Sequence, residues 1–407
     1  MTLSGSTLPG PTLSDPSAPP HPPLFRLHNR VLPVLFGAAT VAALTTGFVT
    51  VAPNRLVSGH PVGLFVAADW RFSAAIIVIA GAILAGAAMP PARALRRAPA
   101  ALAGLLLLLV LGAAGQAATA LAAGMPALAR VSLGAGFWIL LGAAALAVID
   151  ALQRADAGPG ERLGVATALV VAVALMARAG IFDALSLARE YHTRHDLFAA
   201  AVLRHFVLVV AAVGPAVLIG FPLGVFAARR PRVQGPLFAV LNLLQTIPSI
   251  ALFGLLIVPL SALTAAWPTL AELGIGGIGP APAIIALVLY ALLPVVRNSL
   301  AGVAGVDPAV VDAARGMGMS RRQLLWRVEL PLALPLIFAG LRIVTVQAVG
   351  LAVVAALIGA GGLGSFVFAG LGQSAADLVL LGALPAIGLA LAADFLLQTL
   401  PTLATRR

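Results

Sequence analysis

The sequence DAARGMGMSRRQLLWRVELPLALP, residues 312–335, stands between two long apolar runs and differs from both. It contains four arginines, two acidic residues and two glycines, whereas the flanking sequence is dominated by Ala, Leu, Val and Gly. Charged side chains at this density are costly in the hydrocarbon of a bilayer, so the segment is expected to lie at a membrane surface. Its local signals predict two short helices joined by a tight turn.

The first predicted helix covers 308–315. Asp307 is a favourable N-cap residue, and Pro308 suits the first helical position because its missing N–H is not needed there. Gly316 and Gly318 predict the end of this helix, since glycine adopts the left-handed backbone that follows a helix C-terminus.

The second predicted helix begins after Ser320, which forms a capping box with Gln323. Pro331 and Pro335 predict that the chain then turns back into the membrane. The segment is thus a helix–turn–helix at the membrane surface. On these signals alone it either rests on lipid headgroups as an amphipathic hairpin or docks a soluble partner.

The composition places most of the chain in a lipid bilayer. Hydrophobic residues make up 61% of the 407 and charged residues 10%, with a mean hydropathy of +1.06, which no water-soluble domain can hide. The formal charge of +11 calls for no nucleic-acid partner, because membrane proteins retain positive loops on the cytoplasmic side. The chain has no cysteine, which excludes disulfides and thiolate metal sites, and no lysine, which excludes a standard P-loop for ATP.

About ten segments are apolar and long enough to cross a bilayer, which takes roughly 20 residues. The residues before them, 1–30, are rich in Pro, Ser and Thr and predict a disordered tail. A signal peptide is the alternative for the first apolar segment, but the lengths of the tail and of the segment favour an uncleaved helix. The predicted fold is an all-α polytopic membrane protein with spans near 31–52, 73–90, 99–123, 133–151, 163–180, 203–228, 237–260, 281–303, 335–358 and 375–400.

The distribution of arginine predicts the orientation. With the N-terminus inside, most of the 25 basic residues lie on cytoplasmic segments, whereas the outer segments 261–280 and 359–374 contain none. We therefore expect a multi-pass protein of the inner (plasma) membrane with both termini cytoplasmic. The longest polar interruption, 181–202, divides the chain into a five-helix extension over 31–195 and a second domain over 196–407.

Several motifs resemble those of one family. Asp312-Ala313-Ala314, then Gly318, then Glu329-Leu330-Pro331 resembles the "EAA" coupling motif of binding-protein-dependent ABC importer permeases, with Asp where Glu is usual. The stretches NLLQTIPSIALFGLL (242–256), ALLPVVRNSLAGV (291–303) and AALIGAGGLGSFVFAGL (355–371) look like the glycine betaine/carnitine/choline permeases of that family. The resemblance covers roughly 200–400, and the extra N-terminal helices look like those of a longer-chain subgroup.

The resemblance implies that the C-terminal five helices form a permease core and that the 307–331 loop is a coupling helix seated on a separate ATPase subunit, which binds the ATP. It also implies a periplasmic or extracellular solute-binding protein, a second permease subunit (identical or related) and a small osmolyte such as glycine betaine. It implies no cofactor, no metal and no catalytic residue in this chain. The implied coupling residues are Asp312, Ala313, Ala314, Gly318, Arg321, Glu329 and Pro331.

A second candidate site lies in the predicted span 237–260. Asn242, Gln245, Thr246 and Ser249 follow the spacing i, i+3, i+4, i+7 and would share one face of a helix, and Pro248 would break the hydrogen-bond ladder beside them. Two interpretations are open. The stripe either lines the translocation path, as broken helices do in transporters, or hydrogen-bonds to neighbouring helices and holds the bundle together.

Other polar residues occur within or between the apolar segments. Arg342, about two turns into its span, either has a functional role or extends to the cytoplasmic interface. Asp377 and Asp394 are expected near opposite ends of the last span. The glycine run 359–364 predicts a sharp turn or a close subunit contact.

Other classes of function compete with the importer. An ion-coupled secondary transporter of small zwitterions should show inverted repeats and acids at membrane depth, and neither is evident in the sequence. An intramembrane hydrolase needs a nucleophile and a base, and no G-x-S-x-G or H-E-x-x-H motif is present. His192 and His195, with Asp196, suggest a metal site, but an outer loop without a convincing third ligand disfavours it.

Overall fold

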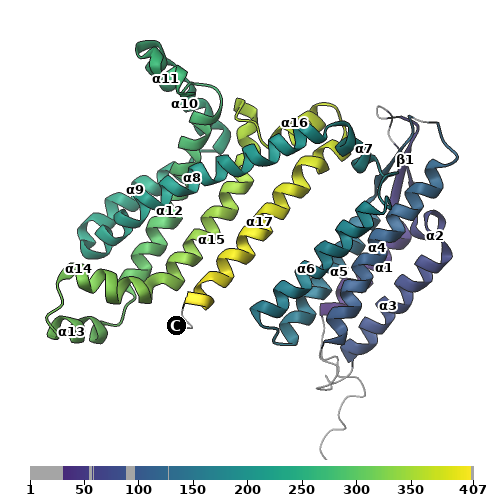
Figure 1. The fold of residues 1–407 in the computed structure, drawn as a ribbon, viewed down its shortest axis with the longest axis horizontal. Helices are drawn as coiled ribbons and strands as arrows, with labels where there is room; N and C mark the ends of the chain where they lie inside the picture. Colours follow the sequence, from purple (N-terminus) through teal and green to yellow (C-terminus); the bar gives the residue numbers. More distant parts are fainter. Residues whose placement is uncertain (1–30, 55–56, 58, 89–96, 127, 405–407) are drawn as a thin grey trace, which may run out of the picture.

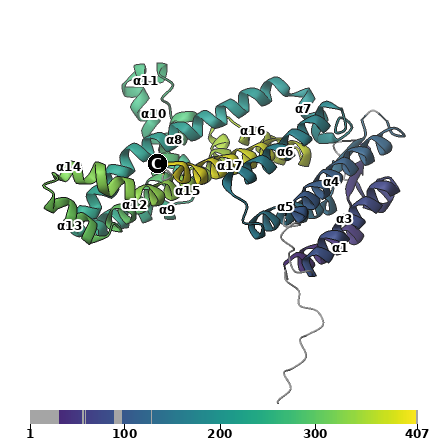
Figure 2. The same ribbon diagram turned by 60° about the horizontal axis from the view of Figure 1, so that its bottom comes forward.

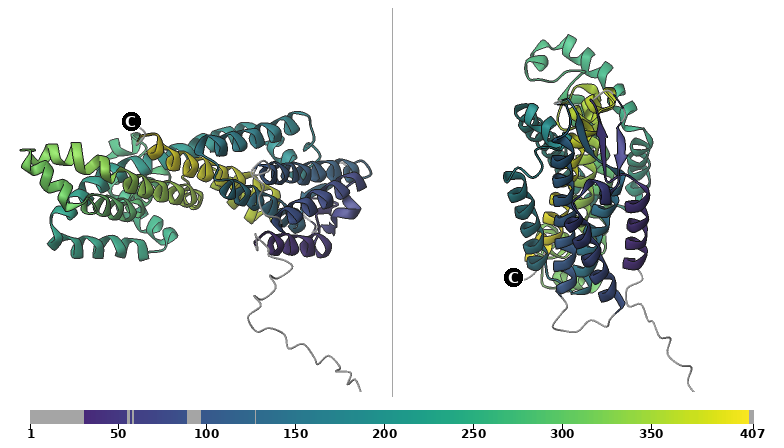
Figure 3. Two further views of the ribbon diagram at one scale, coloured as in Figure 1. Left: turned by 90° about the horizontal axis from the view of Figure 1, so that it is seen from below. Right: turned by 90° about the vertical axis from the view of Figure 1, so that its right-hand side faces the viewer.

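The computed structural model describes residues 31–404, apart from 55–56, 58, 89–96 and 127. The tail predicted at 1–30 lies outside these residues. Two groups of helices lie side by side, an N-terminal extension over 31–178 and a core over 195–404 (Figure 1). Seen from below, the last helix, α17 (Ala376–Ala404), begins beside the extension and ends in the core, at the C-terminus (Figure 3).

Alanine-rich packing holds the extension together. Its long helices are α1 (Val31–Thr45), α3 (Trp70–Ala88), α4 (Ala98–Ala122), α5 (Ala135–Arg154) and α6 (Pro159–Arg178). Helix α4 lies between α3 and α5, and small side chains let these backbones approach closely, which is how helices associate where lipid supplies no hydrophobic drive. The fully buried residues of α4 are Ala103, Val110, Ala113, Ala117 and Ala118.

A small antiparallel sheet covers one end of the extension (Figure 3). Its strands are β1 (Val49–Ala52), β2 (His60–Val62) and β3 (Arg130–Leu133), in the order β2-β1-β3, and the short α2 (Leu64–Ala67) follows β2. Thr50 of β1 pairs with Pro61 on one side and with Ser132 on the other. The sequence analysis did not predict this sheet.

The predicted span 31–52 is therefore wrong in its extent. Helix α1 ends at Thr45, and the last residues of the predicted span form β1. Valine and threonine favour strands. Glycines at the ends of the strands let the backbone segments around residues 47 and 134 approach closely. A Cβ atom on Gly134 would lie 2.2 Å from the carbonyl oxygen of Gly47.

The core is built around α12 (Pro280–Ala304), which packs against α8 (His195–Arg229) and α15 (Leu330–Val354). The crossing of α8 and α12 is close because Gly220 and Gly224 face it, and a Cβ on Gly224 would lie 2.5 Å from that of Ser299. Helix α10 (Ser249–Ala266) packs against α12 through its first half, and the short α11 (Pro268–Glu272) that follows it projects from the core (Figures 1 and 2).

Within the described residues, nine helices are long and apolar enough to cross a membrane, in addition to the shorter apolar α1. The polytopic helical fold class is confirmed. The predicted span 237–260 is wrong as a single helix, because the chain breaks between α9 (Pro231–Thr246) and α10. The nine spans are Trp70–Ala87, Ala98–Ala122, Ala135–Arg154, Pro159–Arg178, His195–Arg229, Ser249–Ala266, Pro280–Ala304, Arg321–Ile358 and Ala376–Thr399.

The glycine run forms the sharp turn expected of it. It follows the 3-10 turn η3 (Ala355–Ile358) and leads into α16 (Gly364–Gly372). Gly359, Gly361 and Gly362 have φ angles of +79°, +79° and +81°, a region that side chains rarely tolerate. The guanidinium of Arg204 on α8 donates a hydrogen bond of 3.1 Å to the carbonyl of Ala360 and fastens the turn to the core.

The extension meets the core near α7 (Ser186–Thr193), which contacts both β3 and α17. The hydroxyl of Ser132 on β3 donates a 2.6 Å hydrogen bond to the carboxylate of Asp377 in the first turn of α17. Arg189 of α7 donates one of 3.0 Å to the carbonyl of Ala129. Asp377 thus lies at the end of its span, as expected, and joins the two parts of the chain.

Candidate functional site

The 307–331 loop has the predicted helix–turn–helix form. The carboxylate of Asp307 caps α13 (Pro308–Gly316) by accepting a 2.9 Å hydrogen bond from the backbone N–H of Ala309. Pro308 occupies the first turn. After α13 the chain turns at Gly318, whose φ of +81° is left-handed, and a Cβ added there would meet no atom within 4 Å.

The second helix starts with the predicted capping box. The backbone N–H of Gln323 donates to the Ser320 hydroxyl (3.3 Å), and the N–H of Ser320 donates to the Gln323 side chain (2.8 Å). This helix, α14 (Arg321–Leu324), continues through a π-helical turn, η2 (Leu325–Glu329), directly into α15.

The chain enters a candidate span after the loop, but Pro331 and Pro335 do not mark a turn, because the helix is continuous from Arg321 into α15. The proline ring collides with the carbonyl four residues earlier in a regular α-helix. The wider π turn falls directly before Pro331 and offers room for that ring. Such turns have no sequence signal that distinguishes them from a helix end.

Three of the predicted coupling residues hold the loop in shape. Ala314 is 2% exposed and packs α13 onto the second helix, and Gly318 supplies the left-handed turn. Glu329 is 8% exposed, and its carboxylate accepts a 2.8 Å hydrogen bond from the guanidinium of Arg229, the last residue of α8. The sequence analysis missed Arg229, since nothing in the sequence indicates which arginine pairs with Glu329.

The remaining predicted residues form the surface that the loop presents outward. Asp312, Ala313 and Arg321 are exposed, as is Pro331 at the start of α15. The carboxylate of Asp312 accepts a 3.2 Å hydrogen bond from Arg315 and stays open on its other sides.

The sequence analysis missed Met317, which is 71% exposed beside this surface. A small helix that exposes Asp312, flanked by a large apolar side chain and by arginines, is suited to a groove on a protein partner.

A basic hollow of about 350 Å³ lies next to the loop, on the second helix. It is lined by Ser320, Arg322, Gln323, Trp326 and Arg327. Trp326 is exposed here beside the two arginines, so acidic groups are the complementary ligands for this surface.

The polar stripe predicted on one helix is divided between two. Asn242, Gln245 and Thr246 lie at the end of α9, whereas Ser249 is the first residue of α10. The chain is extended at Ile247 and Pro248, because proline excludes the α conformation from the residue before it. The spacing argument for a continuous face is therefore wrong, although the helix break expected from Pro248 is present.

Two hydrogen bonds fasten this break to α12. The side-chain amide of Gln245 donates to the carbonyl of Tyr290 (2.8 Å), and the Tyr290 hydroxyl donates to the carbonyl of Ile247. The sequence analysis missed Tyr290, one of only two tyrosines in the chain. Asn242 and Thr246 are exposed at the same break.

Arg342 and Asp394 form an ion pair between α15 and α17. Asp394 lies five residues before the end of the span Ala376–Thr399, near the end of that span as expected. Arg342 lies 12 positions after the start of α15, and the two side chains are partly exposed, at 41% and 31%. Arg342 contacts this acid instead of extending alone to the interface.

The histidines near α7 pair separately with acids. His192 faces Asp183, with 3.8 Å between Nε2 and Oδ1, and His195 faces Asp196 at 3.1 Å. No group of three or more His, Cys, Asp or Glu positioned for a metal occurs among the residues that the structure describes.

Comparison with known proteins identifies the family. Residues 220–402 match the family described as "Binding-protein-dependent transport system inner membrane component". The osmoprotectant import permease protein OsmW of Salmonella typhimurium is 43% identical over 208 residues, which are 51% of this chain and 91% of that protein. The chain belongs to the binding-protein-dependent ABC transporter permeases.

Other relatives agree with this family. The carnitine transport permease protein OpuCB of Listeria monocytogenes is 40% identical over 48% of this chain and 83% of its own length. Residues 28–188 match the "ABC transporter permease YehY, N-terminal domain", so the extension of this permease belongs to a described longer-chain type. A solved chain of the MetNI methionine ABC transporter aligns with a TM-score of 0.45 at 23% identity, over 52% of this permease and 98% of that chain.

Proposed function

We propose that this permease carries a small zwitterionic or quaternary-ammonium osmolyte and that its 307–331 loop docks on a separate ATPase subunit. The observation that carries the proposal is the construction of the loop. Ala314, Gly318 and the Arg229–Glu329 ion pair hold it rigid against α8, while Asp312 and Ala313 remain exposed for a partner. A rigid support is needed to pass movement from a docked subunit to the membrane helices.

The arrangement of the chain ends and loops supports the proposed orientation. The start of α1, the link between α5 and α6, the 307–331 loop and the end of α17 lie toward one end of the helices, and the β-sheet, α7 and α16 lie toward the other (Figure 1). We place the first end in the cytoplasm because arginines gather there. A solute-binding protein then meets the opposite end, and a second permease subunit completes the path. We also place the boundary between the extension and the core near residue 195.

Two features bear on the substrate. Relatives are named for osmoprotectant import and for carnitine transport. Quaternary ammonium groups are commonly held by aromatic cages, but this chain has only two Tyr and four Trp in 407 residues. We therefore assign high-affinity selection to the separate binding protein, and low-affinity passage to the permease.

Reconstituted transport tests the function. Proteoliposomes containing the permease, its ATPase and its binding protein are expected to take up radiolabelled glycine betaine when ATP is supplied. Omission of ATP or of the binding protein should leave only background uptake. The Asp394 carboxylate inside a span is the observation that favours an ion-coupled secondary transporter instead. Uptake by the permease alone, driven by a proton or sodium gradient without ATP, would establish that second function and refute the first.

Engineered cysteines test whether the break between α9 and α10 lines the translocation path. The chain has no native cysteine, so a thiol reagent labels only the introduced residue. Asn242→Cys and Thr246→Cys are expected to react with a membrane-impermeant reagent, and their rates should change when ATP binds. Leu241→Cys, which is 4% exposed on the same helix, is the matched control and should stay unreactive. If neither position 242 nor position 246 is labelled in either nucleotide state, the break between α9 and α10 serves only to pack the helices and does not line the translocation path.

A further inference from the structure

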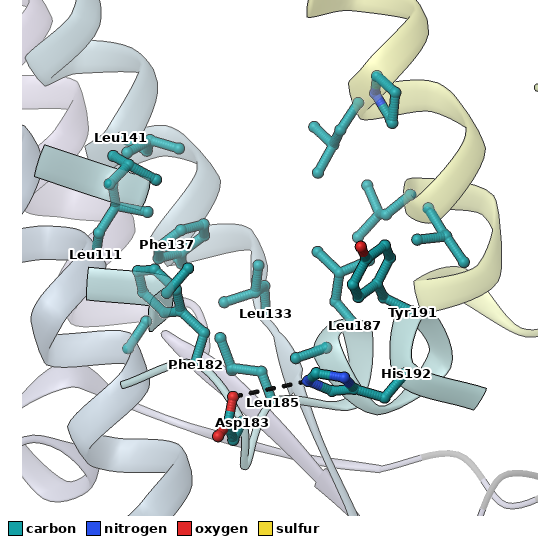
Figure 4. A pocket seen from close by; sticks show the side chains of 18 of the residues that line it. Leu111, Leu133, Phe137, Leu141, Phe182, Asp183, Leu185, Leu187, Tyr191 and His192 are labelled. Carbon is teal, nitrogen blue, oxygen red and sulfur yellow. Dashed lines mark ion pairs between the residues drawn. The ribbon is translucent and has the colours of Figure 1, made fainter. Parts of the chain in front are cut away.

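A large cavity separates the extension from the core. It has a volume of about 640 Å³ and is lined by residues of α4, β3, α5, α6, α7, α17 and the segment between α6 and α7 (Figure 4). Ser132 and α7 hold the two parts of the chain together at one end of it. The cavity is not part of the coupling loop or of the break between α9 and α10.

The lining changes from apolar to polar along the cavity. Leu111 and Leu141 lie at one end, on α4 and α5, and Asp183 and His192 lie at the other, beside α7 (Figure 4). The apolar part continues on α17 with Leu380, Leu381, Leu384 and Pro385. A ligand that fits this lining has a long apolar portion and one polar end.

An arginine on the cavity lining indicates that the polar end of the ligand is anionic. Arg178 closes α6 and lines the cavity. Among the residues described, it has no hydrogen-bond or ion-pair partner. The carboxylate of Asp183 lies beside the imidazole of His192, with 3.8 Å between Oδ1 and Nε2. Arg178 ends α6 five residues before Asp183 in the sequence, so its guanidinium is a free charge on the cavity lining. Phosphate oxygens are its strongest natural partners.

The helices that line the cavity determine which molecules can enter it. Helices α4, α5, α6 and α17 are all among the membrane-spanning segments, so the surrounding solvent is lipid and not water. An apolar cavity that opens toward the hydrocarbon of a bilayer is filled by lipid chains more favourably than by water. We propose that a membrane phospholipid occupies the cavity, with one acyl chain between α5 and α17 and its phosphate held by Arg178.

Trp138 offers a direct probe, because it lines the cavity. The chain contains three other tryptophans, Trp70, Trp267 and Trp326, and replacing these with Phe leaves Trp138 as the single fluorophore. The full-length variant is reconstituted in vesicles with increasing amounts of a phospholipid that carries bromine on its acyl chains. Bromine quenches tryptophan only at short range, so the fluorescence reports occupancy beside Trp138.

We expect saturable quenching of Trp138. A brominated diacylglycerol with the same chains but no phosphate should reach the same quenching only at about tenfold higher concentration in the vesicles. A difference of this size is typical of one charge-assisted contact. Arg178→Gln should bring the two curves together. Ala177→Phe, which fills the cavity from α6, should reduce quenching by either lipid, whereas Ala174→Phe, exposed on the same helix and outside the cavity, should not.

Three results would overturn the proposal. Equal quenching by the two lipids in the chain that retains Arg178 would show that no phosphate is recognised. The absence of quenching by either would show that the protein closes the cavity. Quenching that Ala177→Phe leaves unchanged would place the lipid outside it.

Discussion

Substitution of Asp312 by Arg is expected to abolish substrate-stimulated ATP hydrolysis by the assembled transporter, reducing it about tenfold or more to the basal rate. The side chain is exposed on α13, so its reversal leaves the membrane fold intact. Like charges brought together at an interface cost several kcal/mol, and the substitution also places a fourth arginine beside Arg315, Arg321 and Arg322. The measurement is ATP turnover in proteoliposomes with and without loaded binding protein. Asp312→Glu is the control and should retain coupling, because related permeases usually carry Glu in this motif.

Substitutions at two glycines of the loop test its backbone shape without changing its charge. At both Gly316 and Gly318 an added Cβ would meet no atom within 4 Å, so neither substitution causes a clash. Gly318→Ala forces a side chain into φ +81° at a cost of about 1 kcal/mol, whereas Gly316→Ala, at the end of α13, favours the helix. Only Gly318→Ala should weaken coupling. Equal ATP turnover in the two variants would show that the left-handed turn at Gly318 has no role in coupling.

Removal of one member of the Arg342–Asp394 ion pair should destabilise the permease strongly. Arg342→Leu leaves a lone carboxylate inside the apolar segments, and Asp394→Leu leaves a lone guanidinium, each at a cost on the order of 2–3 kcal/mol. The double variant should recover most of this loss, because an apolar pair of similar volume replaces an ion pair at little cost. Thermal unfolding in detergent measures the three variants.

The double variant also tests function. If the pair serves only to join α15 and α17, transport should return together with stability. If transport stays lost while the unfolding temperature is restored, the pair takes part in the movement of substrate. Single variants that unfold at the temperature of the unchanged chain would contradict the ion pair itself.

The sequence by itself was sufficient for the membrane class, for most of the spans and for the local form of the 307–331 loop. These features depend on short-range physics. An apolar run of sufficient length must lie in hydrocarbon, and the capping bonds of Asp307 and of Ser320 with Gln323 involve residues two or three positions apart. The glycine turn at 359–364 is local in the same sense. Such contacts are set by neighbours along the chain, so a single sequence contains them.

Only the tertiary structure decided the contacts between distant segments. Glu329 pairs with Arg229 one hundred residues away, Arg342 with Asp394, and Ser132 with Asp377. The break after Thr246, stabilised by Tyr290, divided a stripe that spacing alone placed on one helix. The strand β1 formed where an apolar run favoured a longer helix, because it pairs on one side with the nearby β2 and on the other with β3, which lies 78 to 84 residues further along the chain. A charge or strand that must find its partner across the bundle leaves no periodic signal near itself, and the packing of the helices determines which partner it meets.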